Sequence, residues 1–213
     1  MLGRIRWGSG HKIKLYHERI LGLPVLTAEM PCSCRSSERT VRKAARLLRK
    51  NRVVRVLTPP DFPWWPLLKQ AGLGPVDTAR LRWELVPVWV TAQLCRLEVP
   101  RERAILCLSG AEREPALHGS ARALCPLVRG LVFDLPGGGE VADCLRKQMG
   151  MPVLPRDFDR VHLTLLLRGG PVLTGAEITL PGRTWPADCD GLPLLSALWE
   201  AGRIKAEEIA LKI

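Results

Sequence analysis

Hydrophobic residues along the chain fall alternately at helical and at strand spacing. Apolar side chains recur at helical intervals between Ser37 and Asn51, and a β-branched run follows from Val53 to Leu57. Pro59 and Pro60 end this run, because proline does not continue a buried strand. The pattern predicts a helix followed by a buried strand. The apolar positions of the helix are Val41, Ala44, Ala45 and Leu48.

Weaker signals surround this helix and strand in the first half of the chain. Short strand-like runs at Lys12 to Leu15 and Pro24 to Thr27 predict an N-terminal hairpin or two edge strands. The proline-rich and aromatic stretch between Pro59 and Pro75 has room only for a short helix or a turn. A long apolar helix then extends to Leu97, and Pro100 closes this half.

Strands and helices alternate more regularly in the second half. The expected strands cover residues 104–108, 131–135, 151–154 and 161–167, and the expected helices cover residues 116–124 and 140–149. This order predicts a parallel sheet with right-handed crossovers and helices on both faces. After residue 170, a strand at 175–180 and a helix at 192–201 are expected to pack on this sheet as an appendage.

These elements together predict an α/β protein. We expect a Rossmann-like, doubly wound, mostly parallel sheet with a small C-terminal strand and helix appendage. Residues 1–100 form an N-terminal α/β half, and residues 101–213 form the Rossmann-like half with the appendage. A Rossmann-like outline does not specify a function.

Composition is typical of a soluble cytoplasmic protein with a packed core. The 213 residues are 46% hydrophobic and 25% charged. The N-terminus has early positive charge without an apolar segment behind it, so we predict no signal peptide. The apolar run from Leu81 to Leu97 contains Arg82 and Glu84, and we therefore predict no membrane insertion. The odd number of cysteines, 7, fits reduced thiols in the cytoplasm.

A glycine-rich turn after the expected strand at 131–135 is the clearest candidate for a cofactor site. Gly137, Gly139 and Ala142 have the G-x-G-x-x-A spacing that lets a helix N-terminus approach a pyrophosphate. Asp157 follows at the distance expected of an acid that binds a ribose. NAD(P) or another nucleotide is the cofactor implied. The candidate cofactor-binding residues are Gly137, Gly138, Gly139, Ala142 and Asp157.

Three features oppose a bound dinucleotide at this turn. Pro136 lies inside the turn, and Glu140 would place negative charge beside the phosphates. Asp157 lies beyond the short strand rather than at its end. The alternative interpretation is a strand-to-helix turn without a cofactor, and we favour it.

A second alignment of the same motif begins one strand earlier. It takes Ser109-Gly110-Ala111 as the phosphate turn and Asp134 as the acid that ends the next strand. Its order of strand, turn, helix and acid fits the motif better than that of the alignment at Gly137. However, Glu112 and Glu114 face the phosphate position and the later glycines are missing. Two imperfect fingerprints again favour the absence of a cofactor.

Positive charge is concentrated on the helix expected from Ser37. The chain has a formal net charge of +11 and a pI near 9.8, which favours anionic partners such as nucleotides or nucleic acids. One face of the helix collects candidate phosphate contacts, namely Arg39, Arg42, Lys43, Arg46, Arg49 and Lys50. The alternative is the solvated face of an amphipathic helix, which we favour because no nucleic-acid-binding motif accompanies it.

The remaining polar and aromatic motifs are weaker. Cys32 and Cys34 lack the further ligands of a zinc site, so we predict no metal there. The pair Trp64 and Trp65, among prolines, is a candidate contact with another protein or a second copy of the chain. No catalytic constellation is evident, and whether the protein is an enzyme is left open.

The sequence therefore favours a non-catalytic binding protein. The first alternative is an NAD(P)- or nucleotide-dependent enzyme that uses the turn at Gly137–Gly139. The second is a nucleic-acid-binding module that uses the basic helix between Arg39 and Arg52.

Overall fold

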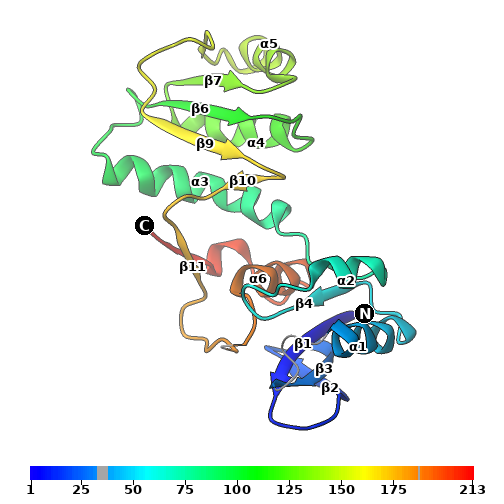
Figure 1. Ribbon diagram of the computed structural model, residues 1–213. Coiled ribbons are helices and arrows are strands. Elements are labelled where there is room, and N and C mark those ends of the chain that lie inside the picture. Colours follow the sequence, from blue (N-terminus) through cyan, green and yellow to red (C-terminus); the bar gives the residue numbers. More distant parts are fainter. Residues whose placement is uncertain (33–37, 187) are drawn as a thin grey trace. The chain divides into compact units, whose positions relative to one another are not determined.

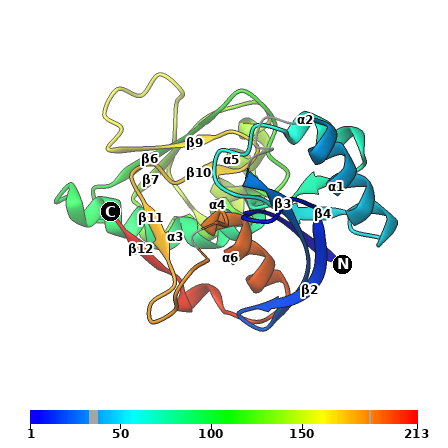
Figure 2. The same cartoon turned by 60° about the horizontal axis from the view of Figure 1, so that its bottom comes forward.

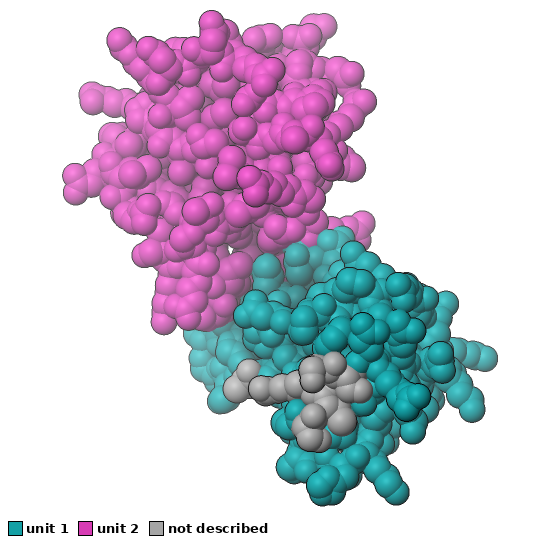
Figure 3. All heavy atoms as spheres, viewed as in Figure 1, with its two compact units in different colours: residues 1–78, 180–208 teal, residues 79–179, 209–213 magenta. Residues whose placement is uncertain are grey.

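The computed structural model describes residues 1–32, 38–186 and 188–213 (Figure 1). They form two compact units, drawn in different colours in Figure 3. Unit 1 comprises Met1–Thr78 and Leu180–Glu208, and unit 2 comprises Ala79–Thr179 and Ile209–Ile213. The chain thus leaves unit 1 at Thr78, whereas the sequence pattern predicts a division at residue 100. The long helix after Thr78 accounts for the difference, because its apolar side chains lie in the core of unit 2.

Both units are mixed α/β, which confirms the predicted class. The described residues contain two mostly parallel five-stranded sheets and six α-helices. Unit 1 contains β1 (Leu2–Gly8), β2 (Lys14–Ile20), β3 (Leu23–Pro31), β4 (Arg55–Leu57), β5 (Gly74–Pro75), α1 (Glu38–Lys50), α2 (Trp65–Gln70), α6 (Gly191–Glu200) and the 3₁₀ helix η3 (Ala206–Glu208). Unit 2 contains β6 (Ile105–Gly110), β7 (Gly130–Asp134), β8 (Val153–Leu154), β9 (Leu163–Leu167), β10 (Pro171–Val172), β11 (Glu177–Thr179), β12 (Ala210–Lys212), α3 (Ala79–Arg96), α4 (Leu117–Leu124), α5 (Gly138–Met149) and the 3₁₀ helix η2 (Cys125–Leu127).

The sheet of unit 1 has the order β2-β3-β1-β4-β5. β1 runs parallel to β3 and β4, and β2 pairs antiparallel with β3, which confirms the predicted N-terminal hairpin. Side chains alternate across a strand, so Ile5 of β1 faces the apolar stripe of α1 while Arg4 and Arg6 face the other side. α2 packs beside α1 in the same apolar core.

Helix α6 lies on the opposite side of this sheet from α1 (Figure 2). Arg55 of β4 pairs with Glu200 at the end of α6, and the Asp190 N–H donates to the Thr58 carbonyl at 3.1 Å. The sequence pattern predicts α6 as an appendage on the second sheet. It instead completes unit 1, because the buried face of α6 contains leucines that need an apolar partner surface.

The sheet of unit 2 has the order β10-β9-β6-β7-β8. β6, β7, β8 and β9 are parallel, and only the short β10 is antiparallel among these five. The chain adds β7 and then β8 on one side of β6, and adds β9 on the other side. The strand order therefore reverses at β6. The chain leaves the carboxyl ends of β6 and β9 by separate connections, the first to α4 and the second to β10.

The core of unit 2 lies between one face of its sheet and the three helices α3, α4 and α5. Leu106 and Leu108 of β6 point into this core with Leu131 of β7. The predicted arrangement, with helices on both faces, is wrong for this unit. The reason is the connection from β8 to β9, where a doubly wound fold would place a helix but residues 155–162 form none.

None of the helices that the structure describes is both long and apolar enough to cross a membrane. The longest described helix, α3, carries charged residues and Pro87 within its 18 residues.

Close packing of α5 against β7 depends on a single glycine. A Cβ atom at Gly138 would lie 2.7 Å from the Cβ of Phe133, which is closer than two such atoms approach in a protein. A Cβ atom at the neighbouring Gly139 would meet nothing within 4 Å. Packing therefore requires glycine at position 138 but not at position 139, although both residues lie in the first turn of α5.

We expect Gly138→Ala and Gly139→Ala to change stability in opposite directions. Gly138→Ala should lower the free energy of unfolding by about 1–3 kcal/mol, because α5 or Phe133 must shift. Gly139→Ala should raise it by up to about 1 kcal/mol, because alanine favours the helix. Urea unfolding of the two variants beside the wild type measures both effects. Equal effects of the two substitutions would show that the contact with Phe133 does not limit packing.

Candidate functional site

Helix α1 has the amphipathic form that its sequence predicts. Its buried residues are Val41, Ala44, Ala45 and Leu48, and its candidate phosphate contacts are all exposed. Four of these cations line a groove of about 370 Å³ together with residues of α2. The lining residues are Arg42, Arg46, Arg49, Lys50, Leu67, Gln70 and Ala71.

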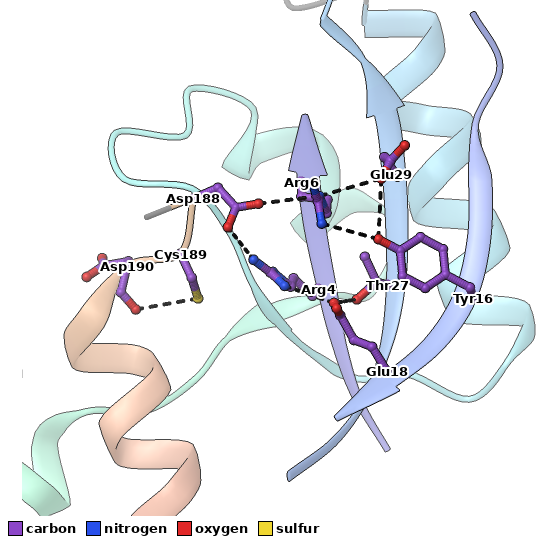
Figure 4. A network of polar contacts seen from close by, with 9 residues as sticks. All are labelled: Arg4, Arg6, Tyr16, Glu18, Thr27, Glu29, Asp188, Cys189 and Asp190. Carbon is purple, nitrogen blue, oxygen red and sulfur yellow. Dashed lines mark hydrogen bonds and ion pairs between the residues drawn. The ribbon is translucent and has the colours of Figure 1, made fainter. Parts of the chain in front are cut away.

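A network of charged side chains occupies the other face of the unit 1 sheet (Figure 4). The strand register explains it, because Arg4 lies beside Thr27 and Arg6 lies beside Glu29 on the neighbouring strand. Tyr16 of β2 is in turn level with Thr27. All of these side chains therefore project from the same face, opposite α1.

Arg4 is the centre of this network and is only 3% exposed. Its Nη1 donates to Glu18 Oε1 at 2.9 Å, and its Nη2 donates to Asp188 Oδ1. Thr27 Oγ1 donates to the same Glu18 oxygen. Arg4 thereby ties β1 to β2 and to the segment before α6.

Arg6 forms the outer part of the network. Its Nε lies 3.4 Å from Asp188 Oδ2 and 3.6 Å from Glu29 Oε2, and its Nη1 donates to the Tyr16 hydroxyl at 3.4 Å. The Tyr16 hydroxyl donates to Glu29 Oε2 at 3.3 Å. Burial raises the pKa of Tyr16, and the carboxylates of Glu18 and Glu29 add to the shift against the opposing Arg6. Tyr16 therefore stays protonated at neutral pH.

Cys189 lies beside the network but is not an activated nucleophile. Burial raises the pKa of its thiol from 9.0 to about 11, with Arg4 opposing this shift and Asp188 adding to it. A nucleophilic cysteine needs the opposite shift, because the thiolate is the reactive form. With each acid in the network paired to an arginine or tyrosine, the arrangement is built to hold the segment before α6 on the sheet.

Unit 2 has a crevice of about 460 Å³ at the carboxyl ends of β6 and β9. This is the point at which the strand order reverses. Its lining consists of two short segments, residues 109–112 at the end of β6 and residues 166–169 at the end of β9. A Cβ atom at Gly110 would lie 3.1 Å from both the Cβ and the carbonyl oxygen of Leu167. Glycine at this position therefore lets the two strand ends approach each other at the floor of the crevice.

Polar groups meet beside this crevice, next to its lining residue Ser109. Ser109 Oγ donates to Asp134 Oδ2 at 3.1 Å, because the two residues are level on β6 and β7. Arg156, from the loop after β8, pairs with Asp134 Oδ1. The sequence pattern predicts Ser109 and Asp134 as members of the second alignment, and it gives no role to Arg156.

The other residues of the second alignment do not form a phosphate turn. Glu112 lines the crevice, and Glu114 accepts a hydrogen bond from the Gly170 N–H at 2.9 Å. α4 begins only at Leu117, so its N-terminal N–H groups follow a loop rather than the strand. A dinucleotide fold instead places the helix N-terminus directly behind the glycine turn.

The predicted turn at Gly137 is formed, and backbone conformation and packing account for two of its three glycines, Gly137 and Gly138. Gly137 has a φ of 79°, in the left-handed region, and Gly138 touches Phe133. Ala142 is 6% exposed within the core, while Asp157 lies exposed in the loop after β8. Glu140, in the first turn of α5, pairs with Arg113 at 2.6 Å, so an acid already occupies the helix N-terminus.

Other predicted positions are dispersed. Trp64 and Trp65 are half-buried and pack against the core of unit 1, where Trp65 meets Phe62 edge to face at 6.2 Å. Cys34 lies outside the described residues, and so does Ser37, from which the basic helix is expected to begin. The prediction of no metal at the cysteine pair therefore stays a prediction. The six described cysteines are free thiols.

Sequence reasoning missed β1 and with it Arg4 and Arg6. The signal was present, because basic and apolar residues alternate from Arg4 to Trp7 as in a strand. It also missed a contact between α4 and α5, where His118 Nε2 lies 3.0 Å from Cys144 Sγ. No local pattern indicates that contact, since the residues lie on different helices.

We expect Arg4→Met to destabilise the protein far more than Arg6→Met. Removing Arg4 leaves the carboxylates of Glu18 and Asp188 partly buried without the cation that compensates their charge, which costs about 3–5 kcal/mol. Arg6 is more exposed, and its loss should cost at most about 1 kcal/mol. Urea unfolding of the two variants measures the difference. Equal losses of unfolding free energy in the two variants would show that Arg4 is not the main anchor of the network.

Cys189 should be the slowest described cysteine to react in the folded protein. At pH 8 only about one part in a thousand of its thiol is ionised, given a pKa of about 11. The exposed Cys32 and Cys95 are the matched references. Iodoacetamide labelling followed by mass spectrometry should show the labelling rate of Cys189 rising toward the rates of Cys32 and Cys95 as the pH rises from 9 to 11. Labelling of Cys189 at the rate of Cys95 at pH 8 would contradict its assigned environment.

Comparison with known proteins gives no indication of function, so only the geometry of the two units bears on it. The chain matches no model of a protein family, and it matches no curated protein.

Proposed function

We propose that the protein is a non-catalytic binding protein whose unit 2 is a Rossmann-like domain. In this proposal, the crevice between β6 and β9 binds a small nucleoside-like ligand. The observation that carries it is the position of the crevice at the point where the strand order reverses. Open α/β sheets bind their ligands at this position, outside the carboxyl ends of the strands.

The strand order supports the Rossmann-like interpretation. If β6 is taken as the first strand, β7, β8 and β9 are the second, third and fourth, and the order becomes 3-2-1-4. This is the order of the first four strands of the dinucleotide-binding fold. The crevice of about 460 Å³ also falls within the usual range of small-molecule pockets, about 300–1,000 Å³.

Asp134 does not itself line the crevice, but it adjoins the lining through its hydrogen bond with Ser109 and is our candidate for ligand recognition. It ends the strand next to β6, where an acid in this fold binds ribose hydroxyls. Ser109 holds one carboxylate oxygen, and Arg156 covers the other. The side chain of Arg156 is 78% exposed, and an exposed ion pair contributes at most about 1 kcal/mol. A pair of ligand hydroxyls can therefore displace Arg156 at low cost.

The same surroundings disfavour a pyrophosphate. Glu112 and Arg168 line the crevice with opposite charges, so the lining offers a phosphate no net positive charge, and the loop from residue 111 to 116 separates the crevice from the N-terminus of α4. Neither feature favours phosphate binding. The ligand class is therefore a nucleoside or a similar hydroxyl-bearing molecule, and an NAD(P)-dependent enzyme is the less supported alternative.

We expect adenosine to bind more tightly than NAD⁺ in isothermal titration calorimetry. Ser109→Ala and Asp134→Asn should each weaken adenosine binding about tenfold, the effect of losing one hydrogen bond. Asp157→Asn is the matched control, because Asp157 is an exposed acid that neither lines the crevice nor is the acid bonded to Ser109, and it should leave affinity unchanged. Recovery of unchanged adenosine after incubation is expected of a non-catalytic protein.

Three outcomes would overturn the proposal. They are the absence of nucleoside binding, tighter binding of NAD⁺ with sensitivity to Asp157→Asn, and conversion of the ligand. Circular dichroism of each variant separates a binding effect from a folding effect.

A further inference from the structure

The groove between α1 and α2 is lined by four cations and, among the described residues, by no acid. One wall is basic and is made by Arg42, Arg46, Arg49 and Lys50 of α1. The other wall comes from α2 and the residue after it, with Leu67, Gln70 and Ala71. The groove is thus charged on one side and mostly apolar on the other. The basic face alone does not distinguish a binding site from a solvated surface, but this second wall does.

The positive charge on α1 is largely uncompensated. Within the described ranges, the one ion pair recorded on this helix joins Arg42 to Glu38 at 3.2 Å, and both side chains are more than half exposed. Such a pair contributes little and is easily exchanged for another anion. Arg49 donates to the Val53 carbonyl at 3.4 Å, which positions its guanidinium at the groove without neutralising it. Arg46 and Lys50 have no acidic partner in the same part of the structure.

The spacing of these cations suits a polymer of repeated charges. Residues three or four apart on a helix lie about 5–6 Å apart along its axis, so the basic positions from Arg39 to Lys50 form a ladder about 16 Å long. A single small anion would need only one or two of them. A phosphate backbone can engage several in succession.

We infer that this groove binds single-stranded nucleic acid, with the backbone on α1 and unstacked bases or sugars against Leu67 and Ala71. A duplex keeps its bases within the stack, so it can use the basic wall but not the apolar one. This inference uses residues of unit 1 alone and does not depend on the proposed ligand of unit 2.

Fluorescence anisotropy of a labelled oligothymidine of about 20 nucleotides, titrated between about 50 and 300 mM salt, tests the inference. Each backbone phosphate neutralised on a single strand contributes about −0.7 to the slope of log affinity against log salt. The variant Arg42→Ala with Arg46→Ala should therefore make the slope shallower by about 1.4. The control Arg101→Ala with Arg103→Ala removes the same charge from an exposed turn in unit 2 and should leave the slope unchanged.

A third variant tests the wall of the groove that α2 forms. Gln70→Glu places a negative charge in the groove without altering α1, and it should weaken binding of the oligothymidine. Thermal unfolding confirms that each variant is folded. Equal changes of slope in the two double variants would overturn the inference, since binding would then be spread over the whole +11 surface. So would tighter binding of a duplex, binding to anionic vesicles alone, or no binding at the lowest salt.

Discussion

Burial of the Arg4 guanidinium is the constraint that organises unit 1. Removing an arginine from water costs several kcal/mol unless acids and hydrogen-bond acceptors replace the solvent. Glu18 and Asp188 supply them, one from the adjacent hairpin and one from a segment 184 positions away in the sequence. A one-residue slip of β1 would turn Arg4 into the apolar core under α1, so the same charge that is costly to bury also fixes the register of the sheet.

Glycine has the corresponding role in unit 2, where close approach of backbones replaces charge pairing. Gly110 lets the end of β6 approach Leu167, and Gly138 lets α5 approach Phe133. The glycine-rich turn that resembles a cofactor fingerprint is therefore satisfied by internal contacts. The open crevice instead lies one strand earlier, where Ser109 and Asp134 meet.

Local patterns in the sequence predict local structure well and distant structure poorly. The basic helix, its buried stripe, the strand before Gly137 and the helix after it are all confirmed, because each depends on neighbours within a few residues. The partner of α6 and the pairing of β1 depend on residues far away in the sequence and leave no periodic trace. For the same reason the basic residues of α1 could be identified, whereas the groove beside them could not. Its second wall comes from α2, whose position is set by tertiary packing.

The division of unit 1 into two stretches of chain has a consequence for its synthesis. Residues 79–179 interrupt it, so a ribosome completes nearly all of unit 2 before Asp188 and α6 exist. Until then the N-terminal sheet has its Arg4 side chain without one of its two carboxylate partners, and the face that α6 covers is open. Domains usually mature in the order in which they are made. Here the stretch translated first is the one that must wait, and its final folding step is the docking of a segment translated more than a hundred residues later.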